Sequence, residues 1–113
     1  MAITFKTATP SALLSAIKEE ITNGKIITWS CDKDGDFTHN LDQWRNKAWL
    51  RPSFGTSELN FGLLGQKETV MTKEIYAVYH GRFIEMVLTH FDTKILQGIA
   101  TAQKSAGDNF KAS

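Results

Sequence analysis

The sequence predicts a two-layer α+β domain in which a four-stranded antiparallel sheet is covered on one face by two helices. Three observations lead to this fold class. Apolar residues recur at helical spacing near the start of the chain and again in its second half. Four runs rich in β-branched and aromatic residues lie between these segments. The connections between the runs are short, which favours an antiparallel meander in the order α-β-β-β-β-α.

The N-terminal helix is expected to begin at Pro10 and to end before Asn23 and Gly24. Proline is favoured in the first turn of a helix, and Thr9 or Ser11 can cap that turn. Asparagine and glycine tolerate the left-handed conformation that ends many helices. The apolar residues of this segment form a single stripe: Leu13, Leu14, Ile17 and Ile21.

The four predicted strands are the runs that alternate or are rich in β-branched residues. They cover residues 25–31 (KIITWSC), 46–54 (NKAWLRPSF), 57–65 (SELNFGLLG) and 73–80 (KEIYAVYH). Pro52 cannot donate a hydrogen bond to a neighbouring strand, so it indicates an edge or the end of the second run.

The long C-terminal helix is expected over residues 82–104, because the pattern changes from alternation to helical spacing after Gly81. The polar segment from about residue 105 is expected to be a frayed tail. The apolar residues that define the face of this helix are Ile84, Val87, Leu88, Phe91, Ile95 and Ile99.

The bulk composition bounds the class of protein. A chain of 113 residues with 42% hydrophobic and 22% charged residues predicts one globular domain over 1–113. The net charge of +1 shows no basic excess, which argues against a dedicated nucleic-acid-binding domain. No apolar run is long enough to span a membrane, and Cys31 is the only cysteine. We therefore expect a cytoplasmic protein.

An acidic stretch, DKDGDFTHN, follows the first predicted strand. Asp32, Asp34 and Asp36 resemble the first ligands of an EF-hand calcium loop, in which alternate carboxylates converge on one cation. The resemblance fails where the loop needs glycine and a bidentate glutamate, because Phe37 and Gln43 occupy those positions. The favoured interpretation is a turn whose aspartates accept hydrogen bonds from nearby backbone amides. We expect no cofactor, and Ca²⁺ or another divalent cation at the three aspartates is the weaker alternative.

A second candidate surface combines aromatic and cationic residues. Alternation along the second strand places Trp49 and Arg51 on the face opposite Leu50. Together with Trp29 and Trp44, these residues could form a platform for a ligand or a partner, with the acidic loop and His39 at its rim. The alternative is that the tryptophans belong to the core and that the arginine stems pack along them.

A third candidate is the stretch YHGRFIE at residues 79–85, expected at a strand-to-helix junction. Backbone amides at such a helix start, with His80 and Arg82, could hold an anion. The favoured alternative is a tight turn with an Arg82–Glu85 ion pair. No motif of a known catalytic class is present, so a hidden enzyme would pair His39 or His80 with Asp36 or Glu85.

The sequence therefore predicts a small cytoplasmic interaction or ligand-binding domain rather than a specific activity. With both helices on one face, the other face of the sheet would be bare and apolar, which predicts a homodimer or a protein partner. The alternative is a small enzyme or a metal-dependent site on the acidic loop and the histidines. The residues expected on the bare face are Ile27, Trp29, Trp49, Tyr76 and Val78.

Overall fold

The computed structural model describes residues 1–111 of the chain. Within these residues, two helices and six strands follow one another in the order β-α-β-β-β-β-α-β, and a short 3-10 helix, Asp92–Lys94, follows the second helix. The helices are α1 (Pro10–Thr22) and α2 (Lys73–Phe91). The strands are β1 (Ile3–Lys6), β2 (Trp29–Cys31), β3 (Phe37–His39), β4 (Ala48–Gly55), β5 (Glu58–Gly65) and β6 (Gln97–Ala100).

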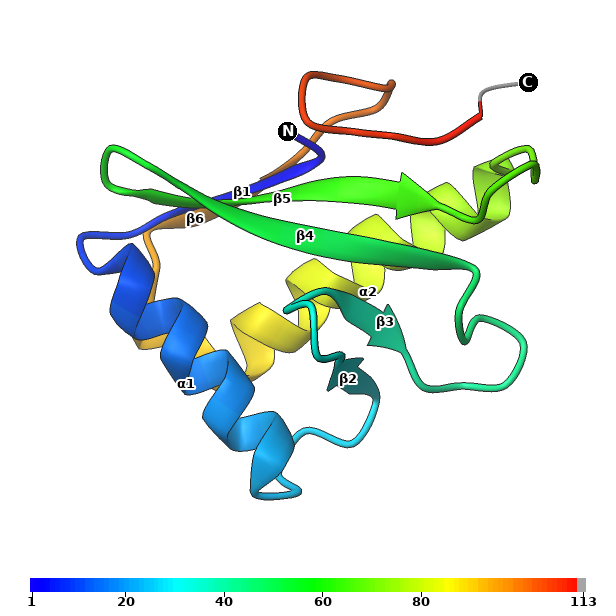
Figure 1. Ribbon diagram of the computed structural model, residues 1–113. Coiled ribbons are helices and arrows are strands. Elements are labelled where there is room, and N and C mark those ends of the chain that lie inside the picture. Colours follow the sequence, from blue (N-terminus) through cyan, green and yellow to red (C-terminus); the bar gives the residue numbers. More distant parts are fainter. Residues whose placement is uncertain (112–113) are drawn as a thin grey trace.

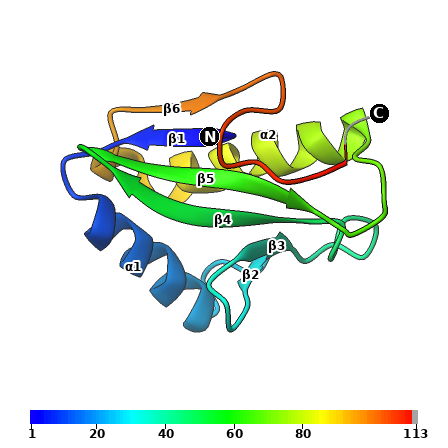
Figure 2. The ribbon, with the colours of Figure 1, turned by 45° about the horizontal axis from the view of Figure 1, so that its top comes forward.

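The six strands form one antiparallel sheet in the order β2-β3-β4-β5-β1-β6, which Figure 2 shows from one edge to the other. Both helices cover the same face of this sheet (Figure 1), so the predicted two-layer α+β class is confirmed. The predicted strand number is wrong, since β1, β3 and β6 were not expected. The meander is limited to β2 through β5, and β1 is inserted between β5 and β6.

The core lies between the sheet and the two helices. Alternate residues of β1 and β5 point toward the helices and are completely buried, among them Phe5 and Phe61. The ring of Phe83 on α2 meets Phe61 edge-on, with 4.7 Å between the centroids. Each such side chain stabilises the fold by about 1.5–3 kcal/mol through burial. The larger aliphatic side chains that are fully buried in the described residues are Ile3, Leu13, Ile17, Leu50, Leu59, Leu63 and Val87.

The segment predicted as the fourth strand, residues 73–80, is the first half of α2. The side chain of Thr72 caps this helix by accepting a hydrogen bond from the backbone N–H of Ile75. The buried residues of α2 recur at helical spacing, because Tyr79, Phe83 and Val87 lie on one face. This helical burial outweighs the β-propensity of the run, as tertiary packing often does.

The chain beyond α2 also differs from the expectation. The predicted helix over 82–104 ends at Phe91, and Gln97–Ala100 instead forms the edge strand β6 beside β1. The segment for which a frayed tail is expected lies beside the end of β5 and the loop that follows it, with Asn109 next to Leu64 and Lys111 next to Val70. The N–H of Asn109 donates to the carbonyl of Leu63, and the N–H of Gly65 donates to the carbonyl of Asn109. Residues 112–113 lie outside the part of the chain that the structure describes.

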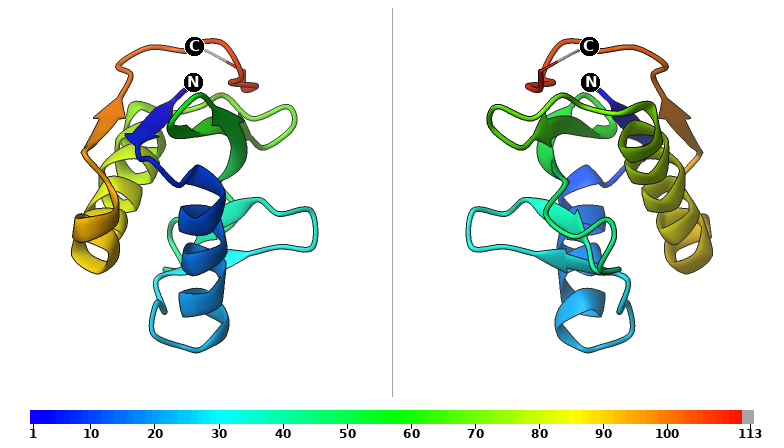
Figure 3. Two further views of the ribbon diagram at one scale, coloured as in Figure 1. Left: turned by 90° about the vertical axis from the view of Figure 1, so that its left-hand side faces the viewer. Right: turned by 90° about the vertical axis from the view of Figure 1, so that its right-hand side faces the viewer.

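No helix within residues 1–111 is long and apolar enough to cross a membrane. The helices diverge beneath the sheet, with α2 on the β6 side and α1 nearer to the β2–β3 hairpin (Figure 3). This arrangement leaves one flank of α2 facing the hairpin and the other flank facing the β6 edge.

Candidate ligand-binding site

A pocket of about 430 Å³ lies between the β2–β3 hairpin and the middle of α2. It brings together two of the predicted site residues, His39 and Arg82, with the edge of a third, Trp29. The remaining lining residues come from the hairpin and from α2: Thr28, Leu41, Glu85, Met86, Thr89 and His90.

His39 is the buried polar side chain of this pocket, with only 2% of its surface exposed. Its Nδ1 accepts a hydrogen bond of 3.1 Å from the backbone N–H of Leu41. A neutral imidazole that accepts at Nδ1 must carry its proton on Nε2. Within residues 1–111, Nε2 of His39 has no hydrogen-bond partner. Nε2 of His80 also has none but is completely buried, whereas Nε2 of His39 is not. His39 lines the pocket and therefore carries there an Nε2–H without a hydrogen-bond partner among residues 1–111.

Two physical effects keep His39 neutral. Burial lowers the pKa of the imidazole, and the positive charge of Arg82 lowers it further. The ring is fixed by packing, because its centroid lies 4.9 Å from that of Trp29 in an edge-on arrangement. At neutral pH, the side chain is a positioned hydrogen-bond donor rather than a cation.

Arg82 is a half-buried cation on the wall of the same pocket. No ion pair among residues 1–111 involves Arg82. The predicted local pair with Glu85 is therefore not formed, although the two residues are three apart on one helix. A guanidinium without an acidic partner next to an N–H donor favours an anionic ligand.

The stretch 79–85 lies in the middle of α2, so the predicted strand-to-helix junction is wrong and no helix N-terminus is available there. His80 is separated from the pocket and is buried. Its Nδ1 donates to the carbonyl oxygen of Tyr76 at 2.7 Å, and its ring stacks on the Tyr76 ring at 3.9 Å. Burial lowers the pKa of His80. His80 and Arg82 therefore do not act together on one ligand.

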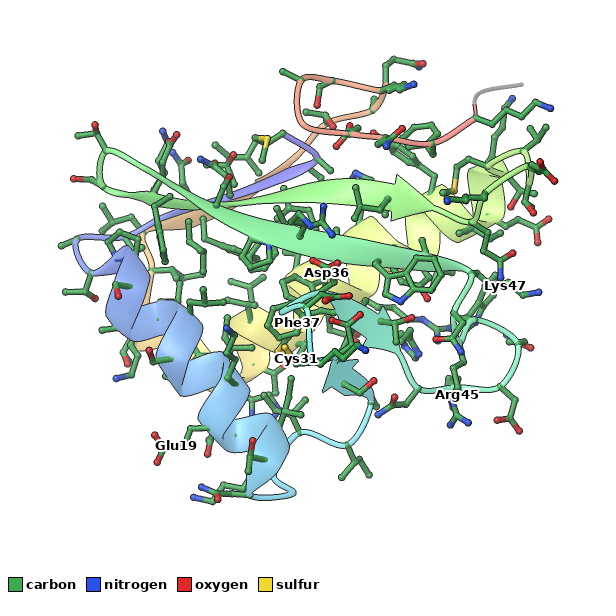
Figure 4. All side chains as sticks on the ribbon, in the orientation of Figure 1. Glu19, Cys31, Asp36, Phe37, Arg45 and Lys47 are labelled. Carbon is green, nitrogen blue, oxygen red and sulfur yellow. The ribbon has the colours of Figure 1, made fainter. Side chains whose placement is uncertain are left out.

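The acidic stretch forms the turn of the β2–β3 hairpin. One carboxylate oxygen of Asp32 accepts hydrogen bonds from the backbone N–H groups of Asp34 and Asp36, at 2.9 and 3.0 Å. This is the turn that the sequence favoured. Asp36 lies between the hairpin and β4 (Figure 4), where both of its oxygens accept from the guanidinium of Arg51, at 3.0 and 2.8 Å. Within residues 1–111, no three acidic, histidine or cysteine side chains are placed to hold a metal ion.

The three tryptophans do not share a surface. Trp29 is 1% exposed and belongs to the core. Trp44 is half-buried on the loop between β3 and β4, where its carbonyl oxygen accepts from the hydroxyl of Tyr79. Trp49 is half-buried on the outer face of β4 and lines a hollow of about 390 Å³ with Arg51 and the acidic turn. The predicted platform is therefore reduced to Trp49 and Arg51.

The outer face of the sheet is more polar than the sequence predicts. Lys6 forms an ion pair with Glu58, and the hydroxyl of Thr4 donates to the side chain of Asn60 at 2.7 Å. Of the residues expected to make this face apolar, Trp29 lies in the core, and Tyr76 and Val78 belong to α2. Three of the five residues expected on this face therefore lie elsewhere, and self-association through a sheet face stays a prediction.

Met86 and Thr89 line the pocket but carry no site prediction from the sequence, whereas Arg82 and Glu85 do. Arg82, Glu85 and Thr89 recur at three- and four-residue spacing, which places them on one face of a helix. This spacing already lies within the helix predicted over residues 82–104, but it does not show which part of the chain faces these residues. The approach of Thr28 and Leu41 from the hairpin is a long-range contact, for which the sequence carries no local signal.

No known protein family, curated protein or solved structure matches this chain. A functional conclusion therefore has to rest on the geometry of the site alone.

Proposed function

We propose that this protein is a small ligand-binding domain that takes up an organic anion, with a carboxylate or phosphate group, in the pocket between the β2–β3 hairpin and α2. The observation that carries the proposal is that one pocket is lined both by buried His39, whose Nε2–H has no partner, and by Arg82, whose guanidinium forms no ion pair. Both groups donate hydrogen bonds, and one of them carries a positive charge.

The shape and lining of the pocket support the same class of ligand. A volume of about 430 Å³ lies in the range of small-molecule sites. Trp29 and Met86 provide an apolar wall for the carbon skeleton of the ligand. A hydrogen bond to a charged group contributes about 1.5–3 kcal/mol, so the Arg82 contact would account for most of the discrimination in favour of anions.

Binding is favoured over acid–base catalysis in this pocket. His39 and Glu85 line it together, which makes them the best placed of the pairs considered from the sequence. However, the lone pair of His39 at Nδ1 is occupied by the N–H of Leu41, and Nε2 carries the proton. The neutral ring therefore offers no lone pair to a substrate and cannot act there as a general base.

We also place the protein in the cytoplasm. Cys31 is the only cysteine, and it is a half-buried free thiol on β2. Burial is the main cause that raises the pKa of this thiol, and the charge of Asp32 adds to it. A protonated thiol is inert as a nucleophile, and Cys31 does not line the proposed pocket, so we assign it no part in binding. A single free thiol suits a reducing compartment.

A panel of matched compounds tests the proposal by thermal shift and calorimetry. Phenyl phosphate and benzoate should raise the melting temperature of the protein, whereas the uncharged benzyl alcohol should not. Arg82→Gln should abolish the shift, and Arg51→Gln serves as the control because Arg51 lies on the outer face of the sheet. A panel without any shift, or equal shifts for benzyl alcohol and phenyl phosphate, would contradict the proposal.

A further inference from the structure

The edge of the sheet at β6 presents unpaired backbone groups. β6 pairs with β1 on one side only and is the last strand of the sheet. The N–H of Thr101 donates to the carbonyl of Ala2 at 2.9 Å, so this residue points its backbone groups toward β1. Because the direction alternates along an antiparallel strand, the N–H and C=O groups of Gly98 and Ala100 point outward.

This edge strand is short, at four residues, but it lacks charged residues and proline, two of the features by which proteins protect a sheet edge from further pairing. Natural edges carry charged residues, proline or a bulge, or they are covered by another segment. The sequence of β6, QGIA, contains neither charge nor proline. Two large apolar side chains accompany the free edge, since Leu96 is 87% exposed and Ile99 is 43% exposed.

The flank of α2 beneath β6 adds apolar surface on the inner side of this edge, whereas Ile99, which pairs with Thr4, lies on the outer face of the sheet. Ala77, Gly81, Ile84 and Leu88 fall within about 60° of the helix circumference at 100° per residue, and none of them is polar. Ile84 contacts the β6 region, because its Cγ2 atom lies 3.5 Å from the position of a Cβ on Gly98. Leu88 is 48% exposed. Figure 3 shows α2 beneath β6 on the same outer side of the molecule.

We propose that a second copy of this chain docks on the surface formed by β6 and this flank of α2. A two-fold axis through Ile99 would pair Gly98 of each copy with Ala100 of the other, so that the outward backbone groups find partners across the axis. The two sheets then form one continuous sheet, and the two α2 helices lie side by side beneath it. Ala77 and Gly81 are small residues on this flank, and the space beside Gly81 is open, since no atom lies within 4 Å of a Cβ placed there.

The chemistry of the surface points to a second copy rather than to an unrelated partner. An antiparallel edge is its own complement under a two-fold axis, which is the symmetry of most homodimers. The surface offers no charge that would call for an opposite charge on a partner. Of the large apolar side chains that are exposed, three lie here and would meet their own counterparts: Leu88, Leu96 and Ile99.

The proposed interface leaves the pocket open. Arg82 and Thr89 line the pocket from the opposite flank of α2, facing the β2–β3 hairpin. Dimerisation and ligand binding are therefore separate properties of the molecule, and either can fail without the other.

Sedimentation and light scattering of the full chain from 1 to 200 µM test the proposal directly. The wild type should give twice the 12.7 kDa mass of the chain at the higher concentrations. Leu88→Glu and Ala100→Pro should each weaken the dimer at least tenfold, the second by removing an outward N–H without touching the β1–β6 hydrogen bonds. Phe54→Glu is the matched control, because Phe54 is 56% exposed on β4. Far-UV circular dichroism confirms that each variant is folded.

Cross-linking tests the register. In a Cys31→Ser background, Ile99→Cys should form an intermolecular disulfide with oxidised glutathione, because a non-hydrogen-bonded pair across the axis has its Cα atoms about 4.5 Å apart. Ser53→Cys, exposed on the outer face of β4, should cross-link far more slowly. A monomer at all concentrations, or a dimer that persists in both Leu88→Glu and Ala100→Pro, would overturn the proposal.

Discussion

Replacing Trp29 by alanine should remove a large part of the stability of the domain. Trp29 is 1% exposed, and its ring meets three others edge-on. The centroid distances are 4.9 Å to Phe83, 4.9 Å to His39 and 5.5 Å to Tyr79. Truncating a buried tryptophan costs about 3–5 kcal/mol. Three edge-on partners, each contributing about 0.5–1.5 kcal/mol beyond burial, place this site toward the upper end.

Trp49→Ala is the matched comparison, because Trp49 lies half-buried on the outer face of the sheet. We expect it to cost about 1 kcal/mol or less. Urea unfolding followed by far-UV circular dichroism gives both free energies without depending on tryptophan fluorescence. A loss below 1 kcal/mol for Trp29→Ala, or a larger loss for Trp49→Ala than for Trp29→Ala, would refute the placement of the two side chains.

Three further changes test other parts of the structure. Because burial lowers the pKa of His39 and of His80, the unfolded chain takes up protons near pH 6.5 that the folded chain resists. The free energy of unfolding should therefore be highest above that pH and should fall on acidification, by at most about 1.4 kcal/mol per pH unit per histidine. A urea midpoint that increases when the pH is lowered from 7.5 to 5.5 would contradict this. Gly62→Ala should cost about 1–3 kcal/mol and speed hydrogen exchange in the C-terminal segment, since its Cβ would lie 2.3 Å from the carbonyl oxygen of Gly107; unchanged exchange would count against the tail position. Asp36→Asn should cost about 1 kcal/mol at low salt and less in 1 M salt, and a loss insensitive to salt would argue against the ion pair with Arg51.

The fold class could be predicted from the sequence because two amphipathic segments and several β-rich runs are visible locally. The strand β1 was missed although Ile3 and Phe5 alternate with Thr4 and Lys6, since four residues give too weak a pattern alone. Its partners, β5 and β6, are far away in the chain. Gly81 was interpreted as a change of period, yet it is an exposed residue inside α2.

The candidate site could be predicted only in part. His39 and Arg82 were singled out from the sequence for separate reasons, and the structure brings them into one pocket. The reason that Arg82 was chosen, an anion at a helix N-terminus, is wrong, because the residue lies in mid-helix. Sequence spacing cannot show which flank of a helix faces a hairpin that lies over 40 residues earlier, so the convergence itself required the structure.

The protonation of the His39 ring tests the central claim most directly. Long-range ¹H–¹⁵N spectra of the imidazoles at pH 7.5 should show His39 with its proton on Nε2 and a bare Nδ1. Titration with phenyl phosphate should shift the Nε2 signal in the wild type and leave it unchanged in Arg82→Gln. A proton on Nδ1, or a His39 signal indifferent to every anion, would contradict the proposed binding site.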